Sequence, residues 1–319
     1  FLIWLGGITT LCSIKIKYSF IHDLEGKLKL KKSTLFYYSL AEMPINIALF
    51  PILVFIPKFY TGEMGVPLAL AANIILAVRI FDVFTDPVVG YINDRTNTKW
   101  GRRRPWIAMA TPLLMVSIYM LFIPPEGAGA LHLFLWMFLL SIATTMLIIP
   151  YYAWGAELSP DYNERSRITG WRSISGVVGS LSAQLIPTIA LVFFGLGGST
   201  NVLYIVGIAS VIIMPICVFL TVSKVPESKD YIKSNISPIK GFKIMLENSP
   251  FKRLIMAFMF GGIAFSITIP LYLFFITYVL KAEEMAIFML TFFYLTNIVA
   301  VPFWVWLSKQ IGKHKAYMC

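Results

Sequence analysis

Long apolar runs, separated by shorter polar segments, make up most of this chain. A helix needs about 20 mainly apolar residues to cross the roughly 30 Å hydrocarbon core of a bilayer. Runs of that length occur at residues 35–57, 66–93, 105–124, 131–156, 173–194, 201–222, 253–279 and 285–307. The pattern therefore predicts an all-α polytopic membrane protein with eight spanning helices.

Basic residues lie almost entirely in alternate polar segments. Of the 27 Lys and Arg residues, 24 fall in residues 15–32, 94–104, 158–172, 223–253 and 308–319. The opposite segments hold only Lys58 and Lys281, and Arg79 lies inside an apolar run. Because basic loops stay on the cytoplasmic side, we expect a multi-pass protein of the cytoplasmic (inner) membrane with a cytoplasmic N-terminus.

The net charge of +11 does not indicate a nucleic-acid partner. The basic residues border apolar runs, whereas a nucleic-acid binder would gather them on one folded face. Only 13% of the residues are charged, against about 25% in an average soluble domain. Attraction to anionic membrane lipid explains the charge more simply.

The longest polar stretch divides the chain into domains. Residues 223–252, with three prolines and several basic residues, are predicted to form a cytoplasmic linker between residues 35–222, a six-helix bundle, and residues 253–319, the truncated start of a second bundle. Residues 1–34 would be a cytoplasmic N-terminal segment. Its first part is apolar but too short to cross, so an interfacial segment and upstream sequence foreign to the protein both stay open.

Charges inside the second apolar run need an explanation. Arg79, Asp82 and Asp86 stand at i, i+3 and i+7, so they share one helix face. An ionisable group in hydrocarbon costs roughly 2.5 to 3.5 kcal/mol, so these three should face protein, water or cargo. With the Thr85 hydroxyl nearby, the acids could bind a small cation or carry a proton. A purely structural ion-pair network is the alternative.

The two aspartates also match the spacing with which membrane prenyltransferases bind magnesium and a diphosphate. Such enzymes carry a second aspartate-rich motif, which this sequence lacks. The three cysteines have no metal-ligand spacing either. We therefore expect no enzyme activity, no cofactor and no metal beyond a possible Na+.

A second motif follows the same run. It consists of Gly90, then Asp94 and Arg95, then Gly101 with Arg102 and Arg103. Gly90 would allow close approach of a neighbouring helix, and Asp94 would hold an arginine or a helix N-terminus. Glu157 is expected to pair with an arginine of this loop. This is the loop signature of the major facilitator superfamily, where it serves gating.

With residues 150–158 and 161–167, the segment 79–105 resembles the glycoside-pentoside-hexuronide:cation symporter family, which includes the melibiose carriers. The resemblance covers most of residues 35–175. It implies a major facilitator fold that works by alternating access. It also implies cation coupling by Asp82, Asp86 and Thr145, and cargo contact by Tyr152 and Arg172. We further expect Asn46, Glu42 and Arg79 to contact the cargo.

Two departures from the family pattern keep the coupling ion open. Asn46 stands where melibiose carriers have an acid, with Glu42 one turn earlier as a possible substitute, and Ile148 replaces an acid on the fourth span. Losing a carboxylate makes H+ as plausible as Na+. We expect a monomeric, cation-coupled symporter of a sugar or glycoside; a lysolipid or another organic solute is the alternative cargo.

Overall fold

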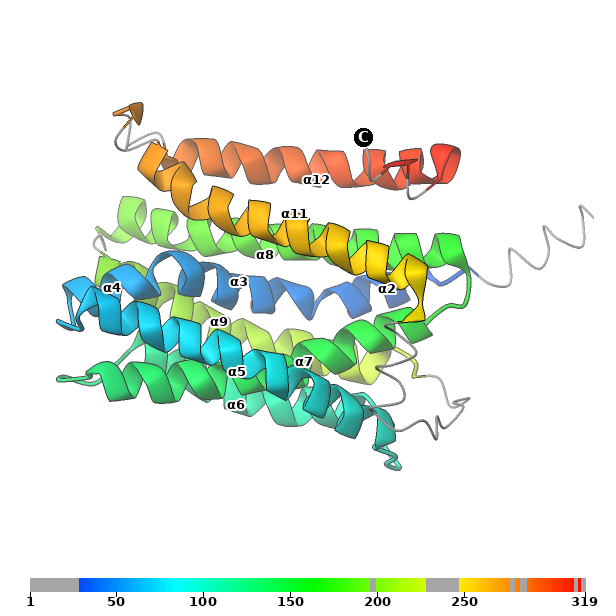
Figure 1. Ribbon diagram of the computed structural model, residues 1–319, viewed down its shortest axis with the longest axis horizontal. Coiled ribbons are helices and arrows are strands. Elements are labelled where there is room, and N and C mark those ends of the chain that lie inside the picture. Colours follow the sequence, from blue (N-terminus) through cyan, green and yellow to red (C-terminus); the bar gives the residue numbers. More distant parts are fainter. Residues whose placement is uncertain are drawn as a thin grey trace, which may run out of the picture.

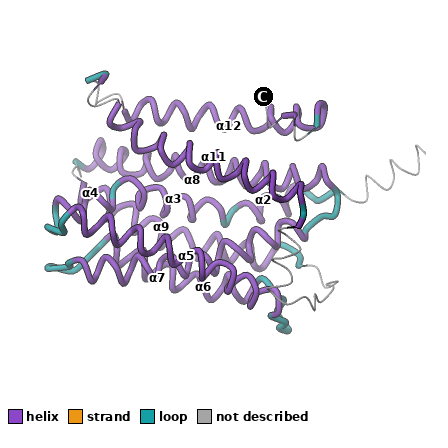
Figure 2. The backbone as a smooth tube through the Cα atoms, viewed as in Figure 1, coloured by secondary structure: helices purple, strands orange, loops and turns teal. Residues whose placement is uncertain are grey.

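The computed structural model describes residues 29–195, 199–227, 247–275, 279–281, 286–312 and 315–316. Helices run side by side along one direction, and the chain reverses at the two ends of the bundle (Figures 1 and 2). They are α2 (Lys32–Ser39), α3 (Glu42–Val54), α4 (Ile56–Gly62), α5 (Leu68–Arg95), α6 (Arg104–Phe122), α7 (Ala130–Glu157), α8 (Tyr162–Phe194), α9 (Ser199–Lys224), α11 (Ser249–Phe274) and α12 (Ala286–Ile311). No strand occurs among the described residues, apart from an isolated bridge between Thr98 and Gly101.

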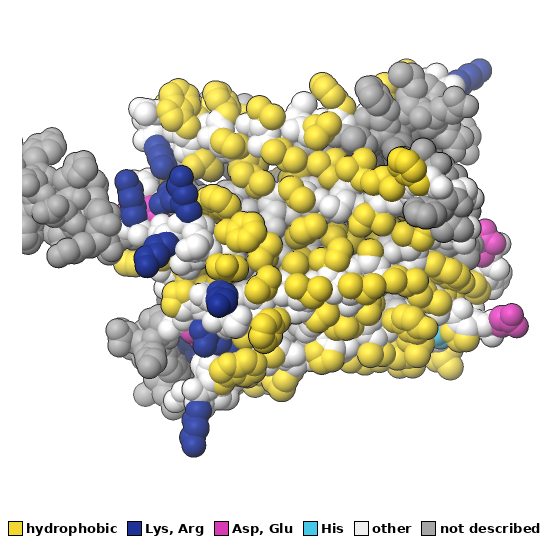
Figure 3. Space-filling view, turned by 180° about the vertical axis from the view of Figure 1, so that it is seen from behind, with side chains coloured by type: hydrophobic (Ala, Val, Ile, Leu, Met, Phe, Trp, Pro, Cys, Tyr) yellow, Lys and Arg dark blue, Asp and Glu magenta, His cyan; other side chains and the backbone are white. Residues whose placement is uncertain are grey.

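Five helical segments within the described residues are long and apolar enough to span a membrane. They are Lys32–Ile52, Leu68–Arg95, Arg104–Phe122, Ala130–Glu157 and Leu203–Lys224. Apolar side chains form a broad band over the bundle, and Lys and Arg gather at one end (Figure 3). The prediction of an all-α multi-pass membrane protein is confirmed. The other three predicted spans fall on α8, α11 and α12, where some side chains lie outside the described residues.

The first predicted span coincides with the candidate span Lys32–Ile52, but short turns interrupt the helix in this part of the chain. The chain turns at Leu40 and Ala41, between α2 and α3, and again at Phe55, before α4. Pro44 lies four residues after Leu40, and Pro57 lies two residues after Phe55. A proline removes one backbone N–H and its ring clashes with the carbonyl four residues earlier, which accounts for the first break and weakens the turn that contains the second.

The fifth predicted span also differs, because α8 begins at Tyr162 and so includes most of the predicted loop 158–172. Asp161 Oδ1 accepts a hydrogen bond of 2.7 Å from the backbone N–H of Glu164. A carboxylate in this position satisfies one of the free N–H groups at a helix N-terminus. The Glu164 carboxylate in turn accepts from the Leu30 N–H at 3.2 Å, which ties the start of α2 to α8.

Two glycines allow α3 and α8 to pack closely. A Cβ on Gly176 would lie 3.1 Å from Asn46 Nδ2, and a Cβ on Gly179 would overlap the Met43 carbonyl oxygen. Small residues of this kind bring helix backbones together in membranes. The other large interfaces join α6 to α7, α5 to α7, α6 to α9 and α12 to α8.

The predicted domain division stays a prediction. Helix α9 ends at Lys224 and α11 begins at Ser249, which agrees with a break between residues 223 and 252. Most of that linker, and residues 1–28 of the N-terminal segment, lie outside the described residues.

Replacing Gly179 by alanine should destabilise the bundle, because the added methyl meets the backbone of α3 rather than a flexible side chain. Overpacking of this kind costs roughly 1–3 kcal/mol, so the melting temperature of the full-length protein in detergent should fall. Gly262→Ala in α11 is the matched control, since no atom of the described residues lies within 4 Å of its Cβ. Equal melting temperatures for the two variants would contradict the close contact.

Candidate functional site

Two carboxylates of α5 face two hydroxyls of α7. The Thr145 hydroxyl donates to Asp86 Oδ1 at 2.8 Å, and the Ser141 hydroxyl donates to Asp82 Oδ1. Each pair of residues is separated by four positions, so the two helices meet in register over one turn. Ser141 and Thr145 are buried, whereas Asp86 remains exposed. The sequence analysis placed Thr145 with the aspartates but missed Ser141.

Arg79 contacts the second carboxylate oxygen of Asp82. Its Nη1 lies 3.3 Å from Asp82 Oδ2, and its side chain is 60% exposed against 18% for Asp82. The Thr85 hydroxyl instead donates to the Asp82 carbonyl oxygen at 3.4 Å. Thr85 therefore serves the helix backbone, and the carboxylates interact with Ser141, Thr145 and Arg79.

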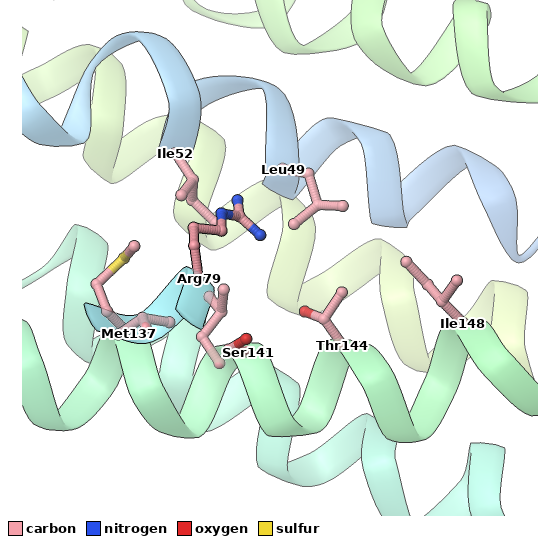
Figure 4. A pocket seen from close by; sticks show the side chains of 9 residues that line it. Leu49, Ile52, Arg79, Met137, Ser141, Thr144 and Ile148 are labelled. Atoms are coloured by element: carbon pink, nitrogen blue, oxygen red, sulfur yellow. The ribbon is translucent and has the colours of Figure 1, made fainter. Parts of the chain in front are cut away.

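A cavity of about 210 Å³ opens beside this pairing, between α3, α5 and α7. Its lining residues are Leu49, Ile52, Val78, Arg79, Met137, Leu140, Ser141, Thr144 and Ile148. Figure 4 shows the Arg79 guanidinium directed toward α3, with the hydroxyls of Ser141 and Thr144 near each other on α7. The Thr144 oxygen is buried and has no hydrogen-bond partner within the part of the chain that the structure describes. The cavity is thus mostly apolar, with three polar groups.

A second cluster lies where α3, α7 and α8 meet. The Tyr152 hydroxyl donates to Glu42 Oε1 at 3.0 Å, and the Arg172 guanidinium carbon lies 3.9 Å from the centre of the Tyr152 ring. Glu42 is only 9% exposed, and its Oε2 has no hydrogen-bond partner among the described residues. The Asn46 amide donates to the Glu42 carbonyl at 2.9 Å. Four of the residues assigned to cargo therefore lie together.

This cluster owes its position to the break between α2 and α3, since Glu42 is the first residue of α3. Two reciprocal hydrogen bonds hold the break against α7. The Tyr38 hydroxyl donates to the Tyr151 carbonyl at 3.0 Å, and the Tyr151 hydroxyl donates to the Tyr38 carbonyl at 2.8 Å. Arg79, the fifth residue assigned to cargo, lies apart from Glu42, beside Asp82.

The loop motif forms an ion-pair network at the basic end of the bundle. Arg103 lies 2.8 Å from Asp94 and 2.7 Å from Glu157, and Arg102 also pairs with Glu157. The expected pairing of Glu157 with a loop arginine is confirmed. Burial lowers the pKa of Arg103, but the hydrogen bonds and charges of Glu157 and Asp94 raise it by more, so this guanidinium stays charged.

Two other residues of the motif play smaller parts. The Arg95 guanidinium lies over the ring of Tyr91, 4.2 Å from its centre. A Cβ on Gly90 would lie 3.8 Å from Ile149 Cγ2. That is an ordinary contact distance, so the described structure leaves room for a methyl group where the sequence analysis expected an especially close approach.

Glu227, which was not singled out from the sequence, binds the loop immediately before α6. Its Oε1 accepts hydrogen bonds from the backbone N–H groups of Arg102 at 2.6 Å and Arg103 at 2.7 Å. Gly101, with φ of +124°, brings the loop against this carboxylate, and a Cβ there would overlap the Glu227 side chain. No local pattern points to this contact, because its partners lie about 125 positions away in the chain.

Metal-binding clusters of His, Cys, Asp or Glu with three or more members do not occur in the described ranges. A cation at the α5–α7 pairing would instead be bound by two carboxylates and by hydroxyl oxygens. Hard cations such as Na+ suit ligands of this kind.

Comparison with known proteins gives the family. Residues 37–319 match the family model described as "MFS/sugar transport protein". The chain belongs to this family. Its members are transporters, so the magnesium-dependent enzyme is not supported, and the resemblance to glycoside-pentoside-hexuronide:cation symporters is confirmed.

Three relatives illustrate the range of this family. The isoprimeverose transporter of Lactiplantibacillus pentosus is 27% identical over 89% of this chain and 60% of its own length. The sodium-dependent lysophosphatidylcholine symporter 1 of Mus musculus is 26% identical over 82% of this chain and 56% of its own. The putative glycoside/cation symporter YagG of Escherichia coli is 25% identical over 72% of this chain and 50% of its own length. This chain thus spans half to three fifths of these relatives.

Glu227→Ala should destabilise the basic end, because two backbone N–H groups of the loop just before α6 lose their acceptor. Leaving a buried donor without an acceptor costs about 1–3 kcal/mol, so the melting temperature should fall and protease should cleave residues 96–103 faster. Glu227→Gln keeps an oxygen acceptor and should have a smaller effect. Unchanged cleavage in Glu227→Ala would show that these two hydrogen bonds do not stabilise the loop.

Proposed function

We propose that this protein is a secondary active transporter that couples the movement of a sugar or glycoside to that of a cation, Na+ or H+. The observation that carries the proposal is the pairing of Asp82 and Asp86 with Ser141 and Thr145 beside a cavity. Two carboxylates at membrane depth are costly unless they serve a function. Family membership supports coupled transport in general.

Coupling follows from linkage between the two ligands. If cargo binds tightly only when the pairing holds a cation, then the cation must bind more tightly when cargo is present. A gradient of the cation can then drive cargo uphill. In carriers of this superfamily two bundles rock around a site near the bilayer midplane, which alternately opens it to either side.

The Glu42–Tyr152–Arg172 cluster is the proposed cargo site. Aromatic faces stack on the apolar faces of sugars. Glu42 Oε2, which has no partner in the described part of the chain, can accept a hydrogen bond from a sugar hydroxyl. Arg172 covers one face of the Tyr152 ring. Cargo that stacks on Tyr152 therefore uses the opposite face or displaces the guanidinium. Asn46 borders the same region, where its side chain packs against Gly176 of α8.

A lysolipid is the second candidate cargo, and the cavity favours it. Six of its nine lining residues are apolar, including Leu49, Ile52 and Met137, which suits a hydrocarbon chain better than a sugar ring. A relative named as a lysophosphatidylcholine symporter supports the same cargo class. Parallel uptake of labelled sugars and labelled lysophosphatidylcholine would distinguish the two.

The remaining proposals concern the protein in its membrane. The basic end of the bundle would face the cytoplasm, in contact with anionic lipid headgroups, so that the N-terminus is cytoplasmic. The ion-pair network of Asp94, Arg102 and Arg103 with Glu157 would then close that side and open during transport. The protein would work as a monomer in the inner membrane.

Asp82→Asn and Asp86→Asn should each abolish concentrative uptake, because an amide cannot bind a cation as a carboxylate does. The measurement is the accumulation of labelled isoprimeverose, phenyl β-D-glucuronide and lysophosphatidylcholine in vesicles containing full-length protein, driven by a sodium gradient or a pH gradient. Glu126→Gln, which removes an exposed carboxylate from a loop, is the control and should accumulate normally.

Full accumulation by both aspartate variants would remove the pairing from the mechanism and refute the proposal. Accumulation driven by only one of the two gradients would identify the coupling ion. Recovery of each variant in the membrane fraction, with a monodisperse size-exclusion profile in detergent, separates loss of coupling from loss of the folded protein.

Tyr152→Phe tests the cargo site separately. The variant loses the 3.0 Å hydrogen bond to Glu42 but keeps the ring beneath Arg172. Leaving a buried carboxylate without that donor should weaken sugar binding roughly 10-fold, consistent with a loss of about 1–3 kcal/mol for an unsatisfied group. Tyr152→Leu, which also loses the ring, should weaken it further. Equal sugar affinities of the original protein, Tyr152→Phe and Tyr152→Leu would show that the cargo binds elsewhere.

A further inference from the structure

We infer that Arg79 is an internal competitor of the coupling cation and that, once displaced from Asp82, it binds acceptor oxygens of the cargo. The inference rests on the proposed symport and adds a physical connection between its two ligands. It gives Arg79 two alternating partners, one on α5 and one in the cavity.

The position of Arg79 supports the first role. Its guanidinium lies 3.3 Å from Asp82 Oδ2, where a cation bound to that carboxylate would also lie. The side chain is 60% exposed, and within the described residues its hydrogen bond goes to Asp82. Ion pairs with one exposed partner are weak, so a cation of comparable charge can replace the guanidinium.

The chemistry of the neighbours makes the displacement selective. Ser141 and Thr145 carry hydroxyls with lone pairs, so each can turn from donating to a carboxylate to coordinating a cation without leaving the site. A guanidinium has five donors and no acceptor, and it has the same sign of charge as the cation. Arg79 alone among these three must move when the cation arrives.

The cavity is where the displaced group goes. Arg79 already lines it, and Figure 4 shows the guanidinium pointing toward Leu49 and Ile52 of α3. A charged group among apolar walls is costly unless it is hydrogen-bonded. The Thr144 hydroxyl, which has no partner in the described structure, can accept one bond. Most of the guanidinium donors are left for oxygens supplied by the cargo.

The cargo must therefore present acceptor oxygens to this cavity, in a carboxylate, a phosphate or neighbouring hydroxyls. Such a cargo holds Arg79 away from Asp82 and so leaves that carboxylate open to the cation. Cation and cargo then strengthen each other's binding through one side chain, as linkage requires.

Arg79→Gln is the first test, because glutamine has no charge to compete with the cation and offers fewer donors to the cargo. Sodium affinity is measured from the rise in melting temperature of the full-length protein, with choline chloride keeping ionic strength constant. We expect Arg79→Gln to bind sodium roughly tenfold more tightly than the original protein, which corresponds to about 1.4 kcal/mol. Arg79→Lys keeps the charge and should stay close to the original.

The cargo affinity of Arg79→Gln should change in the opposite direction to its sodium affinity. With saturating sodium, Arg79→Gln should bind cargo roughly tenfold more weakly, measured by calorimetry with phenyl β-D-glucuronide, phenyl β-D-xyloside and lysophosphatidylcholine as probes. These offer a carboxylate, hydroxyls alone and a phosphate, so the preferred probe identifies the acceptor. If the role of Arg79 were purely structural, Arg79→Gln would bind both sodium and cargo more weakly. Sodium affinity that is unchanged or weaker in Arg79→Gln, or no binding of any probe, overturns the inference.

The two aspartates give a second test. Asn at position 82 holds the guanidinium only weakly, so Asp82→Asn should bind cargo without sodium about as tightly as the original protein does with sodium. Asp86→Asn leaves Arg79 on Asp82 and should stay at the weak, sodium-free affinity. Equal cargo affinities for these variants overturn the inference, while their failure to accumulate cargo would still support the proposed symport.

Discussion

The proposed coupling depends on the contact between α5 and α7, where two carboxylates meet two hydroxyls in register. Helix α5 is the least buried of the candidate spans, so few other contacts hold its acids in place. The hydroxyls come from the buried face of α7, which packs extensively on α6 as well. A well-packed helix thus presents its polar atoms to a helix that has a large uncovered surface, and the cavity lies between these two helices and α3.

The helices themselves follow from the length of the apolar runs, since backbone in hydrocarbon must bond to itself. Hydropathy did not predict the breaks within these helices. Pro44 and Pro57 carried a local signal for the two breaks, but a criterion based on length alone runs through them. Asp161 likewise marked the start of α8, although the residues after it are too polar to be counted as part of a span.

The site was partly predictable for the same reason. Asp82 and Asp86 are recognisable because charge is expensive in an apolar run, and the four-residue spacing of Ser141 and Thr145 on α7 repeats theirs. The sequence alone did not show that α5 and α7 are in contact, so Ser141 was overlooked. Glu227 had no signal at all: its role depends on the fold bringing the end of α9 to the start of α6.

The end of α9 is bound to two other helices. Arg104 at the start of α6 donates to the Val225 carbonyl at 2.8 Å, and the Trp154 indole of α7 donates to the Pro226 carbonyl at 3.0 Å. Glu227 adds its bonds to the preceding loop. A pull exerted through the chain after residue 227 is therefore shared among α6, α7 and α9. Any movement of the following segment would drag on the helix that carries Ser141 and Thr145.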